Sequence, residues 1–280
     1  MDTPTLPSLF ISHGSPMTAL EPREAGAFMK ALGPAIDARF GRPRAIVVAS
    51  AHSTAREPVL LAAARHQAVY DFGGFSPELY TLRYDAPGAP ALAAQVQALL
   101  AASGIRAHCL PQGGLDHGIW TPLRYMYPQA DVPVLPLAFV PSQSPAQQFA
   151  LGEALASLSR QRVLVMGTGS ITHNLSMVFS GGQPPAIDAP EIAESKAFRD
   201  WVEARSLERA WAALLDYRRQ APHAALMHPT DEHWLPWYVA AGAGGREHAP
   251  QRIHASLTFG CLGMDAYAFG PGAEGLSGLI

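Results

Sequence analysis

Three of the eleven histidines in this chain follow short apolar segments across turns of small residues. They are His13, His52 and His173, and Ala45–Ser50 is the clearest of the apolar segments. If these segments are strands of an open α/β sheet, the histidines lie beyond the carboxyl ends, where such sheets bind ligands. Imidazole nitrogens suit zinc, iron, copper or nickel. The pattern therefore predicts one metal centre, although each histidine taken alone is more often a hydrogen-bonded turn residue.

A fourth histidine, His117, follows Asp116 at the start of a predicted short helix, which Asp116 is expected to cap. A purely structural role for His117 stays open beside a chemical one. Two other kinds of site are poorly matched. Gly167-Thr168-Gly169 lacks the third glycine and the lysine of phosphate-binding loops. The serines beside the histidines lack the GxSxG motif of a nucleophilic serine.

A segment near the end of the chain contains two more histidines and two acids. Thr230 is predicted to cap a helix, with Asp231 and Glu232 in the first turn, where acids favour the helix dipole, and with His233 in the same turn. His228, Glu232 and His233 are each candidate metal ligands. The residues alone do not choose between them.

Composition excludes several classes of protein. Only 15% of the residues are charged, the formal net charge is −3, and no basic block is present, so binding to nucleic acid or to a membrane surface is not expected. Cys109 and Cys261 form neither a CxxC motif nor a disulfide framework. No apolar run is long enough to span a membrane, and signal-peptide features are lacking. A cytoplasmic location is therefore expected.

Short aliphatic segments alternate with longer segments rich in alanine and leucine, which is the rhythm of an α/β domain. We predict a single three-layer α/β domain over residues 1–280, with a central mostly parallel or mixed sheet flanked by helices. The expected strands are Ser8–Ser12, Ala45–Ser50, Val59–Leu61, Ile105–Leu110, Val132–Phe139, Val163–Met166 and Ile253–Phe259. The expected helices are Arg23–Leu32, Ala89–Ala102, Pro145–Ser159, Pro190–Ala204, Leu207–Leu215 and His233–Ala241.

Six short motifs occur in a fixed order along the chain. They are Phe10–Met17, Val47–His52, Tyr70–Phe75, Asp116–Trp120, Gly169–Leu175 and Pro229–Pro236. Together they resemble the 4,5-DOPA extradiol dioxygenase family, a branch of the class III (LigB-type) extradiol ring-cleavage dioxygenases. The resemblance extends from the first predicted strand to the C-terminus, so it covers nearly the whole chain.

This resemblance implies a non-haem metal site, with Fe(II) expected for activity and Zn(II) as an ion that also occupies such sites. The ligands that it implies are His13, His52 and His233. It assigns His173 as the acid/base residue and as a candidate further ligand. It assigns His117 as a second active-site histidine, which contacts the substrate.

The resemblance also implies the reaction, in which O2 cleaves the ring of a DOPA-like or other catechol to give a muconic semialdehyde. Trp120 and Phe72 adjoin motif histidines and are predicted to flank a planar substrate. His228 has no match in the family motifs. A non-catalytic metal-binding module of the same fold and a zinc hydrolase are the alternatives. The natural substrate and the formation of a homo-oligomer stay open.

Overall fold

The computed structural model describes residues 5–278, which contain a mixed sheet of eight strands. In spatial order the strands are β4 (His108–Leu110), β3 (Val59–Leu61), β5 (Val134–Ala138), β2 (Ala45–Ser50), β6 (Val163–Gly169), β1 (Ser8–Ser12), β10 (Ala266–Phe269) and β7 (Gln251–His254). The four central strands β5, β2, β6 and β1 run parallel, while β10, β7 and β3 pair antiparallel with their inner neighbours. This mixed sheet confirms the predicted α/β fold class.

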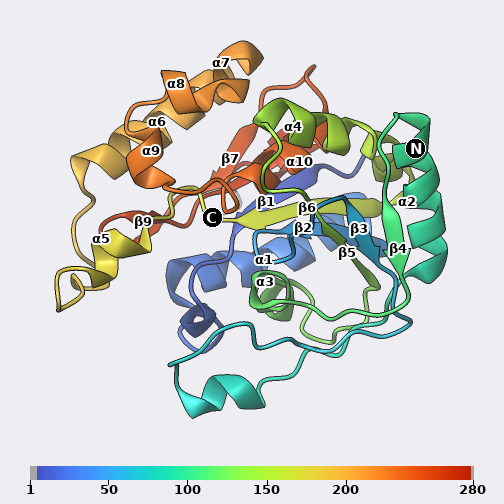
Figure 1. Cartoon of the computed structure of the whole chain (residues 1–280), viewed down its shortest axis with the longest axis horizontal. Helices are drawn as coiled ribbons and strands as arrows, with labels where there is room; N and C mark the ends of the chain where they lie inside the picture. Colours follow the sequence, from blue (N-terminus) through green and yellow to red (C-terminus); the bar gives the residue numbers. More distant parts are fainter. Residues whose placement is uncertain (1–4, 279–280) are drawn as a thin grey trace.

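Helices cover both faces of the sheet (Figure 1). The helices are α1 (Arg23–Phe40), α2 (Pro90–Ala102), α3 (His117–Met126), α4 (Pro145–Glu153), α5 (Leu175–Phe179), α6 (Ala193–Leu207), α7 (Trp211–Leu215), α8 (Tyr217–Gln220), α9 (Ala224–Met227) and α10 (Leu235–Gly244). Four 3₁₀ helices are η1 (Pro16–Ala19), η2 (Pro77–Thr81), η3 (Ala156–Gln161) and η4 (Ala273–Leu276), and β8 (Leu257–Thr258) pairs with β9 (Leu262–Gly263). None of the described helices is long and apolar enough to cross a membrane.

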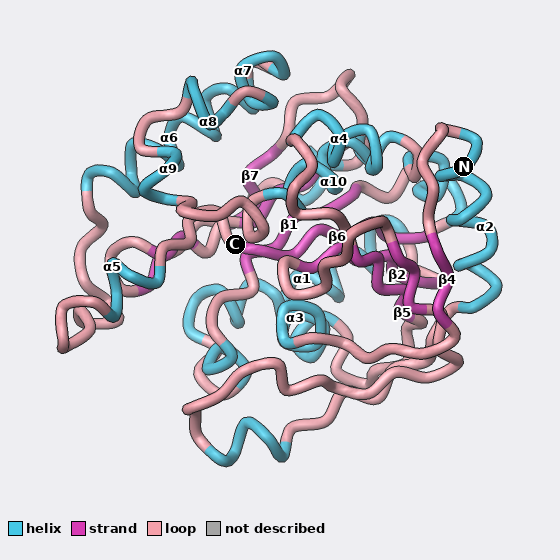
Figure 2. The backbone as a smooth tube through the Cα atoms, in the orientation of Figure 1, coloured by secondary structure: helices cyan, strands magenta, loops and turns pink. Residues whose placement is uncertain are grey.

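The alternation of side chains along the strands builds one core on each face of the sheet. In β2, Val47 joins the core beneath α2, α4 and α10, whereas Ile46 and Val48 join the core beneath α1 and α3. Strands buried on both faces are apolar throughout, as β2 is. The loops, by contrast, gather outside these layers, and the longest of them connects β3 to α2 (Figure 2).

Several predicted boundaries differ from the structure. Helix α1 continues through Pro34 to Phe40, because Ile36 and Phe40 extend its buried stripe beyond the proline. The segment predicted as one strand over Ile253–Phe259 divides into the end of β7 and the short β8. Strand β10 was not predicted, since its four buried residues show no clear period. The helix predicted over residues 145–159 ends early and is followed by η3.

Strand β6 lies between β1 and β2 at the centre of the sheet, and its two glycines allow a close approach of backbone. A Cβ atom on Gly167 would lie 2.0 Å from the carbonyl oxygen of Pro236, and one on Gly169 would lie 2.0 Å from that of His233. The Gly-Thr-Gly segment is therefore part of a strand that packs tightly against the start of α10, not a phosphate-binding loop.

Candidate active site

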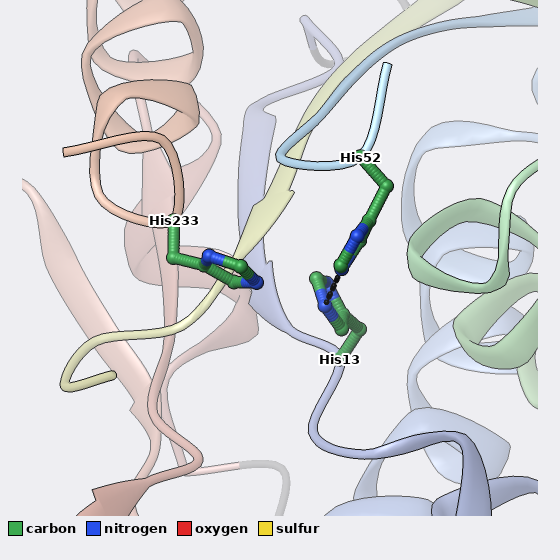
Figure 3. A group of neighbouring side chains, drawn as sticks. All are labelled: His13, His52 and His233. Carbon is green, nitrogen blue, oxygen red and sulfur yellow. Dashed lines mark hydrogen bonds between the residues drawn. The ribbon is translucent and has the colours of Figure 1, made fainter. Parts of the chain in front are cut away.

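Three imidazoles from three segments converge beyond the carboxyl ends of β1 and β2 (Figure 3). One nitrogen of His13, of His52 and of His233 lies within 4.8 Å of the other two, and the Nε2 atoms of His13 and His52 are 3.2 Å apart. Two nitrogens bound to one ion at about 2.1 Å are about 3.0–3.4 Å from each other in octahedral or tetrahedral geometry. The set therefore has the spacing and the donor chemistry that a transition-metal ion requires.

Oxygen atoms of neighbouring side chains lie within hydrogen-bond distance of Nδ1 in two of these rings, those of His13 and His233. Nδ1 of His13 lies 3.0 Å from Oγ1 of Thr168. This hydroxyl donates its own proton to the carbonyl of Gly118, so it accepts from His13. Nδ1 of His233 lies 3.2 Å from the carboxylate of Glu232. An acceptor at Nδ1 keeps the ring proton there and leaves a lone pair on Nε2 for a metal ion.

A third oxygen partner, Asp71, serves two histidines. Both carboxylate oxygens lie 3.0 Å from Nδ1 of His117, and one of them accepts the backbone N–H of His117 at 2.9 Å. Its Oδ2 lies 3.5 Å from Nδ1 of His52. Burial opposes the ionisation of Asp71, but the hydrogen bonds that it accepts from His117 outweigh burial and lower the pKa of the carboxyl group.

The turn that carries His52 is tied to the start of α3. Asp116 occupies the N-cap position of this helix, but its side chain does not make the predicted cap hydrogen bond. Its carboxylate instead accepts the hydroxyls of Ser50 at 2.7 Å and of Ser53 at 2.6 Å. Burial raises the pKa of Asp116 even so. Because α3 begins at His117, these two bonds fix the separation of His52 and His117.

His233 lies in the turn that precedes α10, and the prediction that it occupies the first helical turn is wrong, because the helix begins at Leu235. Thr230 is not the N-cap either, and its hydroxyl donates to Glu232 at 2.9 Å. The backbone holds the turn against the end of β6, where the N–H of Ser170 donates to the carbonyl of His233 at 2.9 Å. This bond sets how far the imidazole of His233 reaches over the sheet edge.

His173 stacks face to face on His233, with ring centroids 3.5 Å apart and planes within 7° of parallel. These two rings and Glu232 form a second group whose ligand atoms lie within 4.8 Å of one another. The lone pair of an imidazole lies in the plane of its ring, and the planes of these two rings are nearly parallel. The stacked geometry therefore does not aim the lone pairs of His173 and His233 at one point.

Four histidines of this cluster have a lowered pKa, which favours their neutral form. Burial and then the neighbouring imidazoles lower the pKa of His13 well below its usual range, that of His52 to about 3 and that of His173 to about 2. Burial also lowers the pKa of His233, although Glu232 opposes this change. Neutral imidazoles carry the lone pairs that a metal ion needs.

The two aromatic residues predicted to flank a substrate have different surroundings. Phe72 lies edge-on to His117, with centroids 5.6 Å apart, and retains accessible surface. Trp120 lies behind Phe72, with centroids 6.3 Å apart, and is fully buried. Its indole N–H donates to the carbonyl of Val69 at 3.0 Å. Phe72 therefore has surface that a ligand can contact, whereas Trp120 has none and packs against Phe72.

His228 lies outside the metal-ligand set. It is fully buried, its Nε2 donates to the carbonyl of Ile171 at 2.9 Å, and its ring stacks on Trp234. Burial lowers the pKa of His228 to about 3. We call the group around it the aromatic layer, which consists of Phe198, Tyr217, His228, Trp234, Trp237 and Tyr238.

Sequence reasoning missed the oxygen atoms that orient the imidazoles. The sequence indicates Glu232 only as a candidate ligand, and Thr168 only as part of a weak phosphate-loop pattern. Asp71 lies within one of the six motifs, but it is 46 residues from His117 on a connection without periodicity. The adjacency of Glu232 to His233 is the one local signal that indicates an orienting carboxylate.

Comparisons with known proteins agree with the site. Residues 7–270 match the family model for the catalytic LigB subunit of aromatic ring-opening dioxygenase. The chain is 37% identical over 266 residues to a Beta vulgaris protein named 4,5-DOPA dioxygenase extradiol, with 94% of this chain and 96% of that protein covered. An Escherichia coli K12 protein of the same name is 33% identical over 248 residues, with 87% of each chain covered.

The fold has a solved counterpart as well. The crystal structure of an uncharacterized Escherichia coli K12 protein superposes with a TM-score of 0.76 at 30% identity, and the match covers 95% of this chain and all of that one. Proteins of the matched family depend on a metal ion, which agrees with the three converging imidazoles. The chain therefore belongs to the LigB family of extradiol, aromatic ring-opening dioxygenases.

Proposed function

We propose that the chain is one catalytic domain over residues 1–280 that cleaves the ring of a catechol, DOPA-like or other, with O2 to a muconic semialdehyde. The observation that carries this proposal is the convergence of His13, His52 and His233, each with an oxygen facing its Nδ1. Three neutral imidazoles leave the charge of a divalent ion uncompensated, so the site favours a ligand that brings negative charge, as a catecholate does.

In this proposal His13, His52 and His233 hold Fe(II) in the active enzyme, and Zn(II) binds the same nitrogens. When bound, Fe(II) supplies the redox chemistry with O2 and lowers the pKa of a catechol hydroxyl. Zinc lacks this redox chemistry, so the zinc-loaded protein is expected to bind a catechol without cleaving it.

His173 is the proposed acid/base residue. Its ring stacks on His233 at the edge of the three converging imidazoles, a position from which it is proposed to accept a proton from a catechol hydroxyl. His117 is proposed to contact the substrate, because its Nδ1 faces Asp71 and its Nε2 has no hydrogen-bond partner within residues 5–278. Phe72 is proposed to flank the catechol ring, with Trp120 acting through Phe72.

The test is anaerobic loading with Fe(II), followed by oxygen-electrode and absorbance measurements with a panel of catechols. We expect oxygen uptake in proportion to a yellow ring-opened product, and no turnover with the zinc-loaded protein. Iron-loaded protein that consumes no oxygen with any catechol contradicts the proposal. Zinc-dependent ester or amide hydrolysis in the same preparation would instead identify a hydrolase.

A further inference from the structure

The connection between β3 and α2 places one carboxylate, Asp71, between two histidines of different function. It accepts from the backbone and from Nδ1 of His117 at 2.9 and 3.0 Å, and its Oδ2 lies 3.5 Å from Nδ1 of His52. The rings of His52 and His117 have centroids 4.1 Å apart. The side chain of Asp71 is 22% exposed, whereas that of His117 is 7% exposed, so His117 has little freedom to find another partner.

We propose that Asp71 is a positioning residue that fixes which ring nitrogen of His117 carries the proton, and that also orients the metal-ligand candidate His52. An ionised carboxylate only accepts hydrogen bonds. Nδ1 of His117 must therefore carry the ring proton, and the free lone pair of this ring must lie on Nε2. For His117, Nε2 is then the atom available to the substrate.

The contacts of Asp71 with the two histidines are unequal. The bonds to His117 have ordinary hydrogen-bond lengths, whereas the 3.5 Å separation from His52 is longer than a well-formed hydrogen bond. His52 is additionally fixed through Ser50 and Ser53, which bind Asp116. The loss of the Asp71 charge should therefore disturb His117 much more than the metal site.

Asp71 also accepts a backbone N–H at the start of α3, where the side chain of the N-cap residue makes no such bond. The carboxylate of Asp116 is occupied by two serine hydroxyls and makes no cap bond. The N–H of His117 is satisfied by Asp71 from a distant segment. Alanine at position 71 would remove both the acceptor for the backbone N–H of His117 and the acceptor for its Nδ1. Asp71→Asn is the cleaner substitution, because the side-chain oxygen of asparagine can still accept the backbone N–H.

The first experiment measures imidazole tautomers by long-range ¹H–¹⁵N NMR on the metal-free full chain. In the wild type we expect His117 to carry its proton on Nδ1. In Asp71→Asn we expect the proton to move to Nε2, because the amide N–H₂ group then faces Nδ1 as a donor. Asp71→Glu should keep the wild-type tautomer. An unchanged tautomer in Asp71→Asn overturns the proposal, and this readout does not depend on any enzymatic activity.

The second experiment rests on the proposed function and uses the iron-loaded protein. For Asp71→Asn we expect kcat to fall about 10- to 100-fold, the range typical of partners that orient active-site histidines, with metal content unchanged. Asp71→Glu should recover part of the loss. The matched control is Asp85→Asn on the same connection, where only the backbone carbonyl accepts a bond, from Arg65.

The outcomes separate the two proposals. Wild-type protein that turns over no catechol contradicts the proposed function and leaves the tautomer measurement to decide the role of Asp71. Active wild type with an equally active Asp71→Asn variant overturns the positioning role. A fall in kcat that is matched by an equal loss in Asp85→Asn, or by a lower melting temperature without a tautomer change, overturns it as well.

Discussion

The histidine cluster and the aromatic layer behind it contain the same side chain in opposite settings. His233 and His228 are five residues apart, and both are almost fully buried with a lowered pKa. His233 has a carboxylate at Nδ1, and one nitrogen of its ring lies within 4.8 Å of nitrogens of His13 and His52. The Nε2 N–H of His228 donates to the carbonyl of Ile171, and its ring stacks on Trp234.

Burial and pKa therefore do not distinguish a ligand from a core residue in this protein. The distinguishing feature is a ring nitrogen that is left free on the side where other nitrogens converge, with its tautomer set by an oxygen on the opposite side. The aromatic layer supplies rigidity, because Trp234 directly follows His233 and packs against Phe198 and Trp237. Each prediction below changes one of these two regions.

The largest effect is expected from His233→Ala. Removal of a ligand should weaken metal binding by more than about 100-fold, the upper range for partners outside the coordination shell, and catechol turnover should disappear with the metal. Metal analysis after dialysis against a defined zinc concentration measures the change. His228→Phe is the matched control from the same segment and should retain its metal. If both variants retain metal, the comparison between the two histidines fails.

The next largest effect is expected from His173→Ala in the iron-loaded protein. Loss of an acid/base residue typically lowers kcat by about 10²–10⁴-fold. Metal stoichiometry should stay unchanged, because the stacked ring does not direct its lone pair at the ion. Steady-state kinetics and metal analysis on one preparation measure both quantities. A loss of metal in proportion to activity would show that His173 is a ligand.

A smaller effect is expected from Thr168→Val, which keeps the shape of the side chain and removes the acceptor for Nδ1 of His13. The affinity for zinc should fall about 10-fold or more, since the ring is no longer held in one tautomer. Thr121→Val is the matched control, because the buried hydroxyl of Thr121 has no hydrogen-bond partner in the described part of the chain. Competition titration against a chelator compares the two variants. Equal affinities would show that Thr168 does not orient His13.

The smallest effect is a dependence of stability on pH. The pKa of His228 is about 3 in the folded chain and about 6.5 when unfolded. The unfolded chain therefore binds more protons between these values, so stability is complete above about pH 6.5 and falls as the pH decreases toward 3. His228→Phe should reduce this slope by about 1.4 kcal/mol per pH unit. Denaturant unfolding of the metal-free protein measures it, and identical slopes would contradict the assignment.

The sequence was sufficient to predict the central strands of the sheet and the histidines that follow them, but not β10. Strands such as Ala45–Ser50 are apolar on both faces, and this pattern identifies a buried strand without knowledge of what packs against it. The location of His13 and His52 follows from the ends of such strands. The start of α10 was predicted two residues early. The sequence suggests Thr230 as the N-cap residue and Glu232 as a first-turn acid, but in the structure these two side chains hydrogen-bond to each other before the helix begins.

The partners of the imidazoles were beyond sequence reasoning for a physical reason. Thr168 contacts His13 across two paired strands, and Asp71 contacts His117 from the irregular stretch between β3 and η2. Such contacts depend on side-chain direction in three dimensions, and no local period encodes them. The role of His228 as a core residue was equally hard to predict, because its aromatic neighbours Phe198 and Tyr217 lie on two other helices.

The position of β6 between β1 and β2 has a consequence for how the metal site tolerates change. Neighbouring strands lie about 4.8 Å apart, so the two strands that carry His13 and His52 are held about 10 Å apart by backbone hydrogen bonds alone. Two imidazoles that reach inward from this separation meet above the end of the middle strand. The distance between the ligand nitrogens therefore depends on the spacing between neighbouring strands. Substitutions of core side chains that leave this spacing unchanged should leave the distance unchanged as well.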